Sequence, residues 1–116
     1  MRAVHWMGAS LTDLRAFPDD VQDEIGHALL KAQRGGKSSK AKPLQGFHGA
    51  GVLEIVENHD GDTYRAVYTV KMAAAIYVLH CFQKKSKRGV ATPKHDLDLI
   101  EQRMKLAVAD AKGRNA

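Results

Sequence analysis

Three central segments of the chain alternate between apolar and other side chains, and this pattern constrains the fold more than any other feature. The segments span residues 51–57, 63–71 and 75–82. The first two are separated by Asn58-His59-Asp60-Gly61-Asp62, which is typical of a tight turn, and the last two by a short turn at residues 72–74. Three consecutive runs with a period of two predict an antiparallel meander of three strands.

The same alternation assigns a face of the sheet to each side chain. In the second strand, Tyr64 and Tyr68 share one face and Arg65 lies on the other. In the third strand, one face is expected to carry Ile76, Val78, His80 and Phe82, and the other Tyr77, Leu79 and Cys81. Tyrosines on a sheet can stack on bases, but at alternate strand positions they more often pack in a core, and we expect that here.

Segments with helical signals lie on both sides of the meander. After a short apolar strand at residues 4–7, the sequence Ser10-Leu11-Thr12-Asp13 resembles a capping box and predicts a short helix. Pro18 suits the first turn of a second helix, which Gly35-Gly36 ends, and residues 34–51 form a long connection. Thr92 as a cap and Pro93 as the first helical residue predict a C-terminal helix.

These elements predict an α+β fold. A small antiparallel β-sheet, made of the three-stranded meander and a short N-terminal strand, packs against two N-terminal helices, and a C-terminal helix follows. The 116 residues suffice for one domain, expected over 1–116. A single cysteine excludes an internal disulfide, and no apolar run approaches the length of a membrane-spanning helix. We therefore expect a cytoplasmic protein without membrane contact.

The net charge of +5 is concentrated in particular segments. Between Lys84 and Lys94 there are five basic residues and no acid: Lys84, Lys85, Lys87, Arg88 and Lys94. A second such run lies between Lys31 and Lys42. A basic run is often only a solvated loop. This one, however, follows directly from a predicted strand, beside the strand that carries Arg65, and a rigid scaffold can hold its first residues in place.

A site shared by Arg65, Lys84 and Lys85 suits a phosphodiester. Arginine can bind two phosphate oxygens at once, and lysines supply point charges. Cleavage of RNA by its own 2′-hydroxyl needs a base, positive charge at the phosphorus and an acid. Arg65 could stabilise charge, and a lysine could titrate if neighbouring cations such as Lys85, Lys87 and Lys94 lower its pKa.

Other candidate sites are weaker. The six histidines are scattered without an H-E-x-x-H motif, so we expect no metal and no cofactor. His80 is expected to be a core or rim histidine, although it lies beside the basic loop. Cys81 is expected to be inert packing.

Several motifs together resemble the phage-derived HigB-like branch of the RelE/ParE toxin superfamily of type II toxin–antitoxin systems. The resemblance covers roughly residues 3–108. The segments that carry it are 13–18, 41–44, 51–57, 60–68, 77–86 and 92–94. Among these, Phe82–Ser86 and Thr92–Lys94 are specific, whereas the apolar strands are not.

The resemblance implies a toxin that inhibits translation by ribosome-dependent, metal-independent cleavage of mRNA. It implies catalytic roles for Arg65, Lys84, Lys85 and Lys94. Lys87 and Arg88 would contact RNA backbone, and His80 and Lys71 are further RNA-binding candidates. The implied partners are the ribosome and mRNA, a HigA-like helix-turn-helix antitoxin and, through that antitoxin, operator DNA. Two alternatives stay open: an inhibitor of a protein target such as DNA gyrase, and a nucleic-acid-binding module without catalysis.

Overall fold

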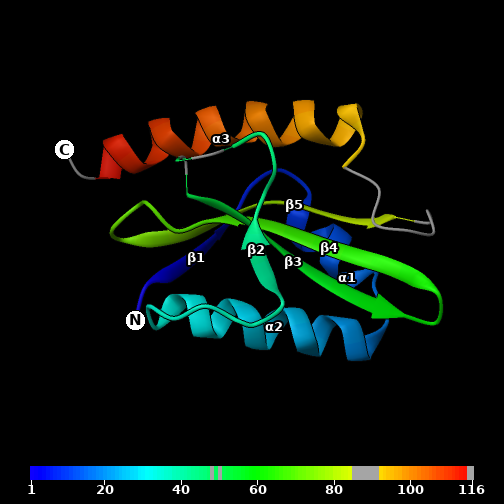
Figure 1. Ribbon diagram of the computed structural model, residues 1–116. Helices are drawn as coiled ribbons and strands as arrows, with labels where there is room; N and C mark the ends of the chain where they lie inside the picture. The colour runs from blue at the N-terminus through cyan, green and yellow to red at the C-terminus, as the bar shows by residue number, and fades with distance from the viewer. Residues whose placement is uncertain (48, 50, 85–91, 115–116) are drawn as a thin grey trace.

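The computed structural model describes residues 1–47, 49, 51–84 and 92–114. Five strands and three helices follow one another along this part of the chain (Figure 1). In order they are β1 (Ala3–Trp6), α1 (Ser10–Arg15), α2 (Asp19–Gln33), β2 (Ala41–Pro43), β3 (Val52–His59), β4 (Asp62–Thr69), β5 (Ala75–Lys84) and α3 (Lys94–Arg114).

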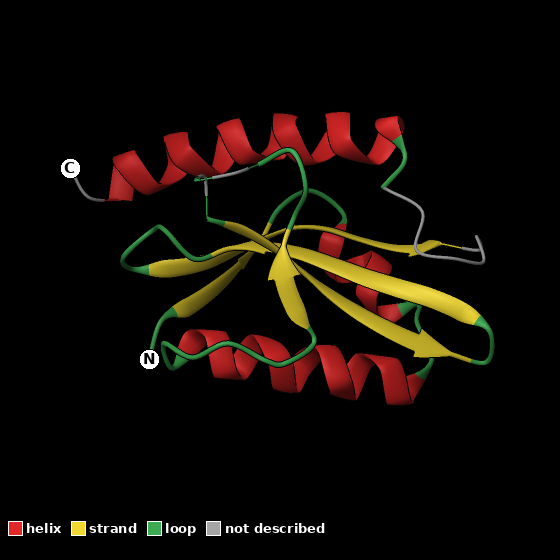
Figure 2. Cartoon of the chain, in the orientation of Figure 1, coloured by secondary structure: helices red, strands yellow, loops and turns green. Residues whose placement is uncertain are grey.

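The strands form one mixed sheet in the order β1-β5-β4-β3-β2 (Figure 2). The predicted meander is confirmed as β3-β4-β5, and the predicted N-terminal strand, β1, joins it. Because β1 pairs in parallel with β5, the prediction that the whole sheet is antiparallel was wrong. One strand was not predicted: β2, which lies within the expected long connection and pairs antiparallel with β3. Its three residues are too few for a period to show, and Pro43 is tolerated because the strand is at the sheet edge.

The β3–β4 turn sets the register across the centre of the sheet. Asp60 and Gly61 both have positive φ, 49° and 83°, which is the requirement of the two-residue type I′ hairpin turn. The pairing that follows places Glu54 opposite Val67 and Val56 opposite Arg65. Glu54 and Arg65 are therefore diagonal neighbours on one face of the sheet.

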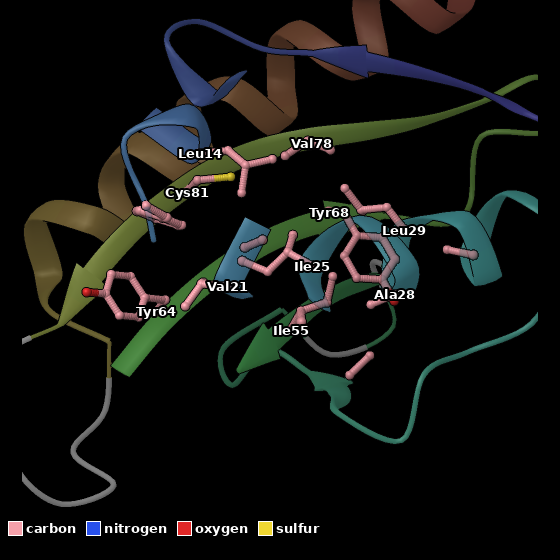
Figure 3. Close-up of a cluster of buried hydrophobic side chains, with 14 of the residues drawn as sticks. Leu14, Val21, Ile25, Ala28, Leu29, Ile55, Tyr64, Tyr68, Val78 and Cys81 are labelled. Carbon is pink, nitrogen blue, oxygen red and sulfur yellow. The ribbon is translucent and has the colours of Figure 1, made fainter. Parts of the chain in front are cut away.

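Helices cover both faces of the sheet. In Figure 1, α2 and α3 lie on opposite sides of it. The core on the side of α1 and α2 is drawn in Figure 3, where Tyr68 lies with Ala28 and Leu29. A second core packs α3 through Ile100 and Ala107 against the other face. Within the described residues, no helix is both long enough and apolar enough to cross a membrane.

A β-bulge corrects the predicted faces of β5. Val67 pairs with His80 and Tyr68 with Val78, so Leu79 is the extra residue. The alternation therefore breaks: Cys81 packs in the α1/α2 core with Val78, while Phe82 packs against the α3 core with Leu79. The prediction that His80 and Phe82 share a face with Val78, and Cys81 with Leu79, was wrong.

Two predicted helix starts also change. Ser10 is not a cap: the N-cap is Ala9, and the buried Ser10 hydroxyl donates to the carbonyl of Val78 at 3.2 Å. The C-terminal helix begins at Lys94, and the carbonyl of Pro93 accepts the hydrogen bond from the Leu97 amide at 3.0 Å. Tertiary contact decides the first case, since the serine lies against β5 rather than in solvent.

Replacing Tyr68 by Phe should stabilise the fold. The Tyr68 hydroxyl is buried without a hydrogen-bond partner among the described residues, and burial raises the pKa of Tyr68 to about 12. Removing an unpaired buried hydroxyl should raise the free energy of unfolding by about 1 kcal/mol in urea denaturation. Tyr77→Phe is the matched control, because the Tyr77 hydroxyl donates to Asp110 Oδ2 at 2.6 Å. That variant should be less stable by about 1 kcal/mol; equal effects would contradict the argument.

Candidate functional site

A row of charged side chains crosses the α3 side of the sheet. It consists of Lys42 on β2, Glu54 on β3, Arg65 on β4 and Lys84 on β5, and we call it the charge row. Lys42 and Glu54 are directly paired in the strand register, Glu54 and Arg65 are diagonal, and so are Arg65 and Lys84. Each member is thus held by a different strand, and the signs run positive, negative, positive, positive.

The centre of the charge row is a buried ion pair. Arg65 donates from a single nitrogen, Nη1, to both carboxylate oxygens of Glu54, at 3.2 and 3.0 Å. The two side chains are 8% and 5% exposed, so water screens the pair weakly. Lys42 approaches Glu54 Oε1 at 3.7 Å from a largely exposed position. The pair leaves Arg65 Nε buried without a partner among the described residues.

Lys84 lies next to this pair at the end of β5. Its residue is 7% exposed. Burial lowers the pKa of Lys84, and the positive charge of Arg65 lowers it further, while Glu54 and Asp96 oppose the shift. The pKa of Lys84 is therefore lowered, as the sequence suggested. The causes are burial and the charge of Arg65, whereas the sequence predicted that neighbouring lysines would lower it. Such a lysine gives up its proton more readily than one in water.

His80 is tied to α3. Its Nε2 lies 2.8 Å from Asp96 Oδ1, and Arg103 Nη1 lies 3.4 Å from its Nδ1. The ring also stacks on Phe82, with centroids 4.8 Å apart. His80 is buried, at 6% exposure. Since Asp96 and Arg103 belong to α3, these contacts join β5 to the helix. His80 lies on the same side of the sheet as Arg65 and Lys84.

The other predicted site residues are not brought to this cluster. Lys94 is exposed at the start of α3 and pairs with Asp98 at 3.0 Å. Lys71 follows the far end of β4, where its Nζ donates to the carbonyl of Gly49. Lys85, Lys87 and Arg88 lie outside the described residues. The structure thus groups Arg65, Lys84 and His80, and it separates Lys71 and Lys94 from them.

Sequence reasoning missed Glu54, Asp96 and Arg103. A signal for Glu54 existed, because it is an acid within an apolar strand and the Asp60-Gly61 turn fixes its diagonal relation to Arg65. Asp96 and Arg103 had no such signal, since their contacts with His80 depend on how α3 crosses the sheet. Among the described residues, no group of three or more His, Cys, Asp or Glu side chains is arranged to hold a metal ion.

The buried ion pair makes a prediction for stability. Arg65→Ala should lower the free energy of unfolding by about 3 kcal/mol, because it leaves the Glu54 carboxylate buried without its main partner. The double variant Glu54→Leu/Arg65→Met removes both charges and should be far closer to the wild type in urea denaturation. If the double variant is as unstable as Arg65→Ala, the loss comes from packing and not from the unpaired charge.

Lys84 should make stability depend on pH. The native state holds the Lys84 proton less tightly than the unfolded chain, where lysine titrates near 10.5. Unfolding therefore takes up a proton between the lowered pKa and 10.5, and wild-type stability rises with pH across that window. Lys84→Met should be more stable than the wild type at neutral pH, with the gain shrinking towards pH 10.5, as measured by denaturation. Lys112→Met, at an exposed position on α3, should show no such trend.

Comparison with known proteins identifies the family. The profile of the family described as Phage derived protein Gp49-like (DUF891) matches residues 12–105. This span runs from α1 into α3 and contains the whole charge row. The search of curated proteins found no match. The family is toxin-like and related to RelE- and HigB-type toxins, while assignment to the HigB-like branch stays a prediction. The chain belongs to the phage-derived Gp49-like family.

Proposed function

We propose that the chain is the toxin of a type II toxin–antitoxin system, and that it is an endoribonuclease cutting mRNA on the ribosome. One observation carries the proposal: Lys84 is buried beside Arg65 at the end of β5, and its pKa is lowered. Family membership supports the toxin role in general. The sequence continues from Lys84 into the basic segment up to Lys94, which supports a polyanionic target.

The chemistry follows from the properties of these two side chains. A lysine with a lowered pKa can accept a proton from the RNA 2′-hydroxyl nearer to neutral pH. The 2′-oxygen then bonds to the phosphorus as the bond from phosphorus to the 5′-oxygen breaks, and the departing 5′-oxygen takes up a proton from water. Arg65 stays charged and can stabilise the negative charge that develops at the phosphorus. Its Nε donor is not used by Glu54, so a phosphate oxygen that reached it would supply the missing acceptor. The reaction as proposed needs no metal ion.

Partners are part of the same proposal. The ribosome and mRNA are the targets, and the basic residues Lys85, Lys87, Arg88 and Lys94 are proposed to contact RNA phosphates. A HigA-like helix-turn-helix antitoxin would neutralise the toxin and connect it to operator DNA. Because phosphate contacts release counterions, ribosome binding should weaken as salt increases.

Inducible expression in bacteria, followed by sequencing of RNA 5′ ends, tests the function. We expect rapid arrest of translation and sharp cuts inside coding regions. Lys84→Met should reduce cleavage by about 100-fold, since it removes the proposed proton acceptor. Lys112→Met removes the same charge from an exposed position on α3 and should cleave like the wild type.

Other outcomes would point elsewhere. Growth arrest with intact mRNA and a DNA-damage response would favour an inhibitor of a target such as gyrase. Ribosome or RNA binding without new 5′ ends would favour a binding module. Cleavage that persists in Lys84→Met at the wild-type rate would overturn the role of Lys84.

A further inference from the structure

Glu54 is the acidic member of a charge row whose other members are cationic. It is 4% exposed and accepts both hydrogen bonds from Arg65 Nη1. A buried ion pair is weak evidence for stability, because desolvation offsets much of its attraction. The position of Glu54 therefore calls for another reason, and that reason lies in what it holds in place.

Without Glu54, the centre of the row would contain two neighbouring cations. Arg65 and Lys84 are both buried, and Arg65 acts on Lys84 by repulsion. Lys42 Nζ lies 3.7 Å from Glu54 Oε1 and adds a further positive charge. On the α3 side, Asp96 also faces Lys84 but is engaged by His80 at 2.8 Å. Asp96 therefore contacts His80, whereas Glu54 contacts Arg65 directly.

The geometry of the pair also orients the guanidinium. Arginine commonly meets a carboxylate with two nitrogens in a fork. Here Nη1 alone takes both oxygens, so the carboxylate fixes one end of the planar group and leaves Nε unbonded among the described residues. A guanidinium anchored through one nitrogen keeps its other nitrogens as donors for a second acceptor.

We propose that Glu54 is a positioning residue of the site: it fixes the Arg65 guanidinium and balances the positive charges of Arg65 and Lys84. The inference rests on the proposed RNA cleavage, since it assigns Glu54 a part in that reaction through Arg65 and Lys84. Glu54 does not itself contact the substrate in this proposal. Its effect should appear in the titration of Lys84 and in the rate of the chemical step.

The test compares Lys84 in four forms of the full chain: wild type, Glu54→Gln, Arg65→Gln and the double variant. The pKa of Lys84 is measured by NMR of its side-chain carbon next to the amine. Glu54→Gln should lower the pKa of Lys84, because the repulsion from Arg65 is no longer offset. The double variant should bring it back towards the wild-type value. If Glu54→Gln does not fold, Arg65→Gln should still titrate at higher pH than the double variant.

Cleavage on the ribosome supplies the second measurement. Glu54→Gln should lower kcat by about 10- to 100-fold with little change in KM, because a misplaced group mainly costs the chemical step. In the pH profile of kcat for Glu54→Gln, the acidic limb, where activity is lost as pH falls, should move to lower pH together with the Lys84 titration. Glu54→Asp keeps the charge and should keep the position of that limb.

The outcomes separate this inference from the proposed function. Wild-type protein that cuts no mRNA would overturn the proposed function, while the NMR titrations would still decide whether Glu54 balances the row. Active wild-type protein with the same Lys84 titration in all four forms would overturn the inference alone. A lower kcat without any shift of the acidic limb would show that Glu54 is only structural.

Discussion

The buried pair of Arg65 and Glu54 is the interaction on which the arrangement of the α3 side of the sheet depends. Two charges in a weakly screened interior tolerate few positions, since each must keep its partner within hydrogen-bond reach. Their strands are locked by the Asp60-Gly61 turn, which leaves one register for β3 and β4. The sheet therefore supplies the rigidity, and the ion pair supplies a reason why the register cannot slip.

The helix α3 completes this side by polar as well as apolar contacts. Ile100 and Ala107 are fully buried against the sheet. Near its start Asp96 reaches His80, and near its end Asp110 accepts the Tyr77 hydroxyl. Two polar contacts at opposite ends fix where the helix lies along the sheet, which a stripe of apolar side chains would leave less defined. On this side of the sheet Glu54, Arg65 and Lys84 are buried, whereas Lys42 is largely exposed.

Much of the fold could be predicted from the sequence because it depends on local patterns. The meander, the two N-terminal helices, the C-terminal helix and the Asp-Gly turn all have short-range signals. The alternation also predicted that Arg65 lies on the other face of β4 from Tyr64 and Tyr68, as the structure shows. Strand β2 and the buried Ser10 were missed because pairing partners far along the chain determine them. For Lys84, the sequence predicted only that its pKa would be lowered. The causes, burial and Arg65, belong to the assembled sheet.

The bulge at Leu79 has a consequence for the site. With strict alternation, Lys84 would share the side of Val78 and face α2, across the sheet from Arg65. The one extra residue reverses the parity of the last part of β5 and brings Lys84 to the side of the charge row. Arg103 donates to the carbonyl of Leu79 at 2.9 Å, and it passes Gly8, where a Cβ would lie 2.6 Å from its guanidinium. Gly8, in the loop after β1, thus leaves room for Arg103, which holds the bulge residue. Although Gly8 lies outside the charge row, it therefore supports the bulge that places Lys84 on the same side of the sheet as Arg65.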